Sequence, residues 1–165
     1  ALGCDDQARR SVLRELNRAA GAGGMVGGQV LDLLAEGRRL RIGELDRLHR
    51  MKTGALVTAS LMIGGIAAGA SSGTLNGLEK FGRGIGLAYQ VTDDLLDATA
   101  SAGELGKNPS DGRLGKSTYV SLCGLEETSR RARRLVDESL ETLRQEKIDG
   151  PELGALARHV IERDR

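Results

Sequence analysis

Hydrophobic and polar residues recur along the chain at the spacing of amphipathic helices, and no segment alternates residue by residue as a β-strand would. Glycine-rich stretches and an Asp-Gly-Pro turn divide this pattern into separate segments. Helices are expected at about residues 5–20, 25–36, 43–70, 75–98, 126–146 and 151–162, with a further apolar helical start at 118–122. The pattern therefore predicts an all-α protein, without internal repeats or linkers that would mark a second domain.

The helix predicted at 75–98 combines an acidic face with an apolar one. The acidic face consists of Gln90, Asp93, Asp94 and Asp97, at spacing i, i+3, i+4 and i+7, and the apolar face of Ile85, Ala88, Val91 and Leu95. Carboxylates in a buried helix are costly unless a cation compensates them, and no other group nearby is expected to neutralise this face. Three carboxylates with room for water suit Mg²⁺, which bridges protein carboxylates to phosphates. A solvated acidic turn that binds nothing is the alternative.

A polar loop follows this helix at residues 103–119, with the sequence GELGKNPSDGRLGKSTY. It contains Lys107, Asp111 and Lys116, and its glycines and proline would let the lysines reach over whatever the metal ions hold. The acidic helix and the basic loop together predict a diphosphate site.

The glycine-rich segment GAGGMVGGQ at 21–29 fits neither the dinucleotide-binding pattern nor the P-loop, and no strand precedes it. Its glycines are instead expected to let neighbouring helices approach closely. In the helix that follows, Met25, Gln29 and Asp32 are spaced i, i+4 and i+7. The amide and the carboxylate therefore share one face, as they would if both pointed into a cavity.

Composition excludes several classes of function. The 24 basic and 23 acidic residues give a net charge of +1, and aromatic residues make up 2% of the chain, so a nucleic-acid partner is not expected. Cys4 and Cys123 fit no zinc or CxxC spacing, which indicates a reducing compartment and cytoplasmic localisation. The uncharged run at 54–70 approaches the length of a membrane span, but its Gly, Ala, Ser and Thr content favours helix packing within a bundle.

Other charged residues are given no chemistry. His49 and His159 have no Cys, Asp or His at metal-ligand spacing. The four arginines Arg130, Arg131, Arg133 and Arg134 are expected to form a solvated helix face, with an anion patch as the alternative.

Four ordered segments resemble the trans-isoprenyl diphosphate synthases of the polyprenyl synthetase family. They are GMVGGQVLDL at 24–33, LHRMKTGAL at 48–56, FGRGIGLAYQVTDDLLD at 81–97 and ELGKNPSDGRLGKSTYVSLCG at 104–124. The DDLLD sequence resembles the second aspartate-rich motif of that family. The resemblance implies the C-terminal helices of the isoprenoid synthase bundle. It also implies Mg²⁺-dependent, head-to-tail condensation of isopentenyl diphosphate with an allylic diphosphate, giving farnesyl or geranylgeranyl diphosphate, in a homodimer or in a pair with another prenyl synthase subunit.

The resemblance also assigns roles to individual residues. Metal ligands would be Asp93, Asp94 and Asp97; the diphosphate would be neutralised by Lys52, Lys107 and Lys116; Thr53 and Gln90 would stabilise the carbocation. Gln29 and Asp32 complete the predicted substrate-binding set. A basic C-terminus in this family can fold near the cavity, which would involve Arg163 and Arg165. Without the resemblance, Lys52 is interpreted as a surface lysine. For Gln90, whose place on the acidic face suits an amide dipole directed at positive charge, an amide that satisfies buried backbone is the alternative.

The chain departs from the family in one major respect. The family has a first aspartate-rich motif followed by paired arginines, well upstream of the GMVGGQ segment, and this sequence contains none. DDQARR at 5–10 mimics it superficially but is interpreted as a helix start capped by Asp5 or Asp6. The spacing from Lys107 to Asp111 is also one residue shorter than the family's.

The sequence therefore predicts a single partial domain over residues 1–165, inactive by itself, with apolar faces such as the 54–70 helix left open. A non-catalytic partner of a full-length prenyl synthase and a relative of the terpene cyclases are the alternatives.

Overall fold

The computed structural model describes residues 5–103 and 116–163. Its elements are α1 (Asp6–Ala20), α2 (Met25–Leu34), α3 (Ile42–His49), the π-helical turn η1 (Arg50–Gly54), α4 (Ala55–Ala67), α5 (Ser72–Gly103), α6 (Tyr119–Gln145) and α7 (Pro151–Glu162). The described residues contain no strand. The predicted all-α class is therefore confirmed.

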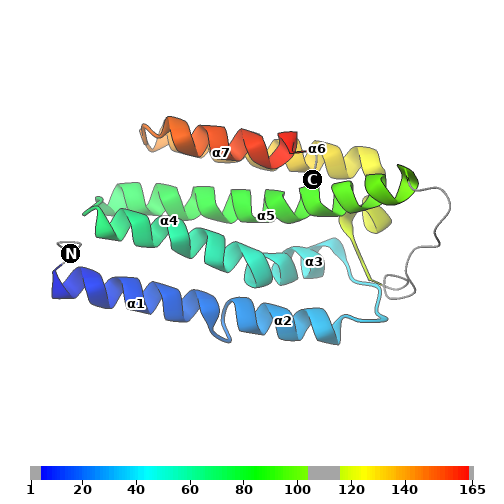
Figure 1. Cartoon of the computed structure of the whole chain (residues 1–165), viewed down its shortest axis with the longest axis horizontal. Helices are drawn as coiled ribbons and strands as arrows, with labels where there is room; N and C mark the ends of the chain where they lie inside the picture. Colours follow the sequence, from blue (N-terminus) through cyan, green and yellow to red (C-terminus); the bar gives the residue numbers. More distant parts are fainter. Residues whose placement is uncertain (1–4, 104–115, 164–165) are drawn as a thin grey trace.

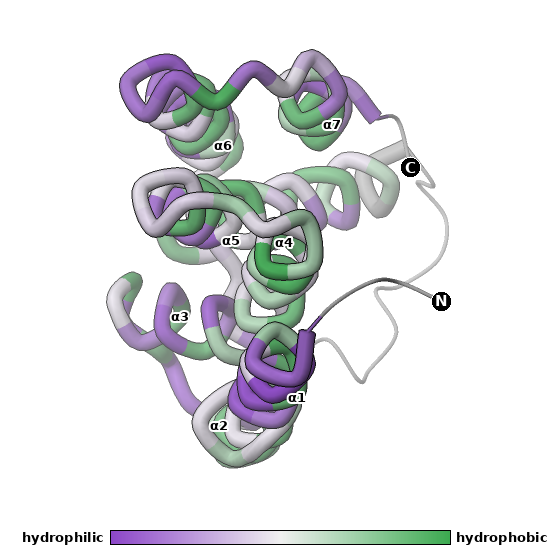
Figure 2. The backbone as a smooth tube through the Cα atoms, turned by 90° about the vertical axis from the view of Figure 1, so that its left-hand side faces the viewer, coloured by the Kyte–Doolittle hydropathy of each residue, from purple (hydrophilic) through white to green (hydrophobic). Residues whose placement is uncertain are grey.

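The helices lie roughly side by side in stacked rows (Figure 1). The long helix α5 runs through the middle and packs against α6 and α7 on one side and against α4 on the other. Helix α4 in turn packs on α1, and α2 continues the row that α1 begins. The end-on view in Figure 2 shows the same order of rows from α6 and α7 to α1 and α2.

Helix ends follow the predicted signals closely. Asp5 caps α1, because its carboxylate accepts a hydrogen bond of 2.7 Å from the Ala8 amide, as expected for a helix start at DDQARR. Pro151 occupies the first turn of α7, where its missing N–H costs nothing. The apolar start at 118–122 and the charged helix after it form one element, α6, broken at Gly124, whose φ of 80° is not helical.

The helix expected at 43–70 is subdivided. Residues 50–54 form a π-helical turn between α3 and α4, and this turn contains Lys52 and Thr53. A π turn contains an extra residue, so it changes the direction in which the following side chains point, and such turns often occur at functional sites. Sequence periodicity did not predict it.

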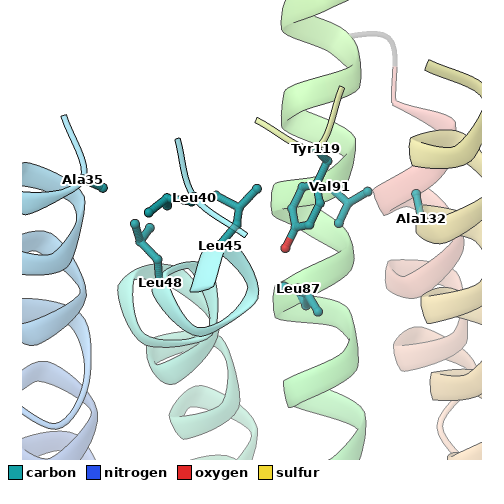
Figure 3. Packing of buried hydrophobic residues seen from close by; sticks show 8 residues of the cluster. All are labelled: Ala35, Leu40, Leu45, Leu48, Leu87, Val91, Tyr119 and Ala132. Carbon is teal, nitrogen blue, oxygen red and sulfur yellow. The ribbon is translucent and has the colours of Figure 1, made fainter. Parts of the chain in front are cut away.

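The core beside the predicted site is made by apolar side chains from α3, α5 and α6. Leu87, Val91 and Tyr119 have no exposed surface, and Leu45 and Leu48 are buried against them. Figure 3 shows the Tyr119 ring among these side chains. This packing fixes the start of α6 against the acidic part of α5.

Among the described residues, the largest group of exposed apolar side chains lies on α2 and not on the helix for which exposure was expected. Large side chains of α4 are at least half-buried, although that helix is apolar almost all round (Figure 2). On α2, by contrast, the exposed apolar residues are Val26, Val30, Leu33 and Leu34. In the described part of the chain no helix is both long enough and apolar enough to cross a membrane.

Candidate active site

A cavity of about 440 Å³ opens between α2, α3, η1, α5 and the start of α6. Its polar lining consists of Asp32, His49, Lys52, Gln90, Asp93, Asp94, Asp97, Lys116, Ser117 and Thr118. Four buried apolar residues, Ala35, Leu40, Leu45 and Leu48, and the half-buried Ala98 complete the wall. The cavity thus unites the predicted acidic face with the predicted lysines at 52 and 116.

Two predicted site residues in the described part of the chain are not part of this lining. Gln29 is exposed on α2 and does not line the cavity, so the structure does not support its predicted place beside Asp32. Thr53 is half-buried in η1, next to the lining residue Lys52. Lys107, like Asp111 and Arg165, lies outside the described residues.

Asp32 holds the two lysines in place. Its Oδ2 accepts hydrogen bonds from Lys52 Nζ at 2.7 Å and from Lys116 Nζ at 3.1 Å. Partial burial raises the pKa of Asp32, but hydrogen bonds from the two lysines outweigh burial and the net shift is downward. Asp32 therefore stays ionised at neutral pH and orients both ammonium groups at the cavity.

Close backbone packing brings these groups together. A Cβ at Gly28 would lie 2.3 Å from the Lys52 amide nitrogen, so only glycine allows α2 to approach η1 this closely. Asp32 lies one helical turn beyond Gly28, on nearly the same side of α2. The predicted role of the glycine-rich segment in close helix packing is confirmed at this position.

Asp93 already has a cationic partner. Arg163, directly after α7, pairs with the Asp93 carboxylate, donates a hydrogen bond of 3.1 Å to the Tyr89 carbonyl, and stacks on the Tyr89 ring with its guanidinium carbon 3.9 Å from the ring centre. The expectation that no nearby group could neutralise the acidic face is therefore wrong at Asp93. The two residues are 70 positions apart, so no local pattern indicated the pair.

Asp94 is tied to the start of α6. Its Oδ2 accepts a hydrogen bond of 2.7 Å from the Tyr119 amide. Burial raises the pKa of Asp94 to about 6, and the neighbouring carboxylates Asp93 and Asp97 add to the rise, while the Tyr119 hydrogen bond opposes it. The acidic face is thus short of positive charge despite Arg163.

This raised pKa predicts a pH-dependent stability difference in the metal-free protein. Between pH 4 and 6 the folded state binds more protons than the unfolded state, so Asp94 lowers the free energy of unfolding as the pH rises through about 4 to about 6. We expect Asp94→Asn, which keeps an acceptor for the Tyr119 amide, to be more stable than wild type at pH 7 by up to about 2 kcal/mol. The advantage should disappear near pH 4. Thermal unfolding in EDTA measures it, with Asp137→Asn on an exposed part of α6 as the control, and a pH-independent difference would contradict the assignment.

A second polar cluster, formed by Asp46, Tyr119 and Arg131, holds the start of α6 next to the cavity. Asp46 on α3 accepts a hydrogen bond of 2.7 Å from the Tyr119 hydroxyl and bonds of 2.8 and 2.6 Å from Arg131. Arg131 therefore does not belong to a solvated arginine face, because it is mostly buried against Asp46 and the Tyr119 ring. The cluster fixes Tyr119, whose amide reaches Asp94.

His49 is a cavity residue that sequence reasoning missed. Its ring nitrogens are buried, its side chain interacts with Gln90, and its ring lies 5.6 Å from that of Tyr119. Burial lowers the pKa of His49, so the ring is neutral at pH 7. Its spacing of three residues from Lys52 could have indicated that the two share a helix face.

The donor set at the acidic face suits a hydrated Mg²⁺ ion. All the donors on Asp93, Asp94 and Asp97 are carboxylate oxygens at the edge of a cavity, which this metal prefers. Within residues 5–103 and 116–163, however, no three acidic or other ligating side chains converge closely enough to form a metal site. The residues therefore fit an ion that would take its remaining ligands from water and from a bound phosphate group.

Comparison with known proteins agrees with this geometry. The model of the polyprenyl synthetase family matches residues 7–151, and the chain belongs to that family. It is 43% identical to farnesyl diphosphate synthase of Escherichia coli strain K12, over 97% of this chain and 55% of that protein.

Solved structures show the same fold. An FPP/GFPP synthase from Zymomonas mobilis aligns with a TM-score of 0.79 and 34% identity, over 94% of this chain and 52% of the other. Geranyltransferase from Helicobacter pylori, complexed with magnesium and isoprenyl diphosphate, aligns with a TM-score of 0.77 and 31% identity, over 97% and 53%. The predicted family and fold are confirmed, and the chain spans about half the length of these relatives.

Proposed function

We propose that this chain supplies one side of the active site of a short-chain prenyl diphosphate synthase, which joins isopentenyl diphosphate to an allylic diphosphate head to tail. The observation that carries the proposal is the single cavity in which the acidic face of α5 meets Lys52 and Lys116, both held by Asp32. The proposed reaction is supported by the relatives' names, such as farnesyl diphosphate synthase. The proposed use of Mg²⁺ is supported by the geranyltransferase structure that contains magnesium and isoprenyl diphosphate.

The acidic residues Asp93, Asp94 and Asp97 would hold Mg²⁺. When bound, the metal supplies positive charge that stabilises a departing diphosphate. Lys52 and Lys116 would bind the same diphosphate, because each ammonium group uses one hydrogen bond on Asp32 and has donors to spare. Since both lysines are already oriented in the free protein, little side-chain entropy remains to be lost on binding.

Gln90 is oriented for a role at the carbocation. Its Nε2 donates a hydrogen bond of 3.0 Å to Asp93, and a carboxylate can only accept, so the amide NH₂ must face Asp93. The negative end of the amide dipole, the carbonyl oxygen, then points away from Asp93, and Gln90 lines the cavity. Thr53, in the π turn beside Lys52, would add a hydroxyl oxygen to the same region.

The proposed enzyme requires a second part. Exposed apolar residues on α1 and α2 lie on the same row of helices: Leu13, Leu16, Val26, Val30, Leu33 and Leu34. Such a surface is typical of an interface. A complementary N-terminal part, or a prenyl synthase subunit in a homodimer or heteromer, would cover it.

Kinetics of two variants test the proposed roles. A suitable enzyme is a chimera of two parts. Its N-terminal part is the portion of the Escherichia coli synthase that this chain does not cover, and its C-terminal part is this chain. Lys52→Met should raise the KM for the allylic diphosphate about tenfold, because a charge-assisted contact to the diphosphate is lost. Thr53→Val, which is nearly isosteric, should instead lower kcat about tenfold.

Lys80→Met is the matched control, since Lys80 forms an exposed ion pair with Glu146 and does not line the cavity. Ordinary kinetics combined with a large fall in melting temperature for both site variants would assign Lys52 and Thr53 to structure and not to catalysis.

A further inference from the structure

A second cavity, of about 210 Å³, lies between α1, η1, α4 and α5. It shares no lining residue with the acidic cavity. Three arginines contribute to its wall, Arg18 from α1, Arg50 from η1 and Arg83 from α5. Its other lining residues are small or apolar apart from one hydroxyl: Ala19, Gly23, Met51, Gly54, Ala55 and Thr58.

The charge around this cavity is unbalanced. Arg18 pairs with Glu15 at 2.8 Å and Arg83 pairs with Glu79 at 2.6 Å, but neither glutamate lines the cavity. Arg50 has no ion pair with any residue in the described ranges. Each guanidinium has five N–H donors, so the two ion pairs leave most of the donors unused.

We propose that this cavity is a metal-independent binding site for a phosphate or diphosphate group. Guanidinium groups recognise phosphate oxygens in a bidentate manner, and three of them from different helices can surround one anion. The volume is smaller than that of typical small-molecule pockets, so it suits the anionic head and not a whole prenyl ligand. The acidic cavity, by contrast, would repel the same anion unless a metal ion were bound.

Calorimetric titration in excess EDTA tests the site, with inorganic pyrophosphate as the probe and the purified chain as the protein. We expect one saturable site. Arg50→Gln should weaken it at least about tenfold, because an unpaired guanidinium donates charge-assisted hydrogen bonds to the anion. Arg50→Lys, which keeps the charge and loses the planar fork, should bind with intermediate affinity.

Arg158→Gln is the matched control, because Arg158 is exposed on α7 and its loss changes the net charge equally. Absence of saturable binding in EDTA, or an equal loss in Arg158→Gln and Arg50→Gln, would overturn the proposal. A parallel titration with geranyl diphosphate distinguishes the source of the group. Equal affinity would indicate recognition of the free diphosphate, and tighter binding would indicate that a prenyl chain contacts the apolar residues.

The two proposed sites can fail separately. Asp97→Ala should leave pyrophosphate binding in EDTA unchanged, because Asp97 lines the other cavity. Arg50→Gln should leave Mg²⁺-dependent binding at the acidic face in place.

Discussion

Asp97→Ala is expected to weaken Mg²⁺-dependent binding of a bisphosphonate or of pyrophosphate at least about 100-fold. Removing a group that only supports a metal ligand typically lowers metal affinity about 10- to 100-fold, and Asp97 is itself a proposed ligand. Asp97 lines the cavity from α5 and is exposed. Calorimetry with and without Mg²⁺ on the prenyl synthase chimera measures the effect. Asp137→Ala, an exposed acid on α6, is the control for net charge.

Asp93→Ala should show a similar loss of affinity together with a second effect. This change removes a proposed metal ligand and also leaves Arg163, whose side chain is 10% exposed, without its carboxylate partner. We therefore expect a lower melting temperature in this variant. Unchanged bisphosphonate affinity in both variants would remove the metal assignment.

The second large effect concerns the chain by itself. These 165 residues are expected to give no condensation of dimethylallyl or geranyl diphosphate with radiolabelled isopentenyl diphosphate and Mg²⁺. The family resemblance implies carboxylates on both sides of the cavity, and here all the acidic residues that would bind metal come from one helix, α5. A diphosphate would then have only part of the charge needed to stabilise its departure.

The chimera with the Escherichia coli N-terminal part is the positive control for this assay. It should turn over substrate, and its stability should rise because the exposed apolar residues of α2 become covered. Product above the no-enzyme level from the chain by itself would show that upstream carboxylates are dispensable, and the proposed division of the active site would be wrong.

Local features of the structure could be predicted because their causes are local. Asp5 caps α1 and Pro151 starts α7 through contacts within one turn, so sequence position alone determines them. The shared face of Gln90, Asp93, Asp94 and Asp97 follows from helical geometry, and all four line one cavity. The four motifs also identified the family, because their order along the chain is itself sequence information.

Features that depend on distant partners could not be predicted. Lys52 and Lys116 both bind Asp32, across 20 and 84 residues, and this pairing decides where the ammonium groups point. Gln29 was expected to share the cavity with Asp32 because the two are three residues apart. The structure leaves Gln29 exposed, because Asp32 is tied to η1 by the close packing at Gly28.

The sequence by itself thus determined the helices, their caps and the acidic face, since each depends on periodicity and on groups within a few residues. Only the tertiary structure decided which charges neutralise one another. Arg163 meets Asp93, and Arg131 meets Asp46 across 85 residues, because packing of whole helices brings their ends together. It likewise decided that Arg18, Arg50 and Arg83 line one cavity, because α1 and α5 both pack on α4 and η1 packs directly on α5.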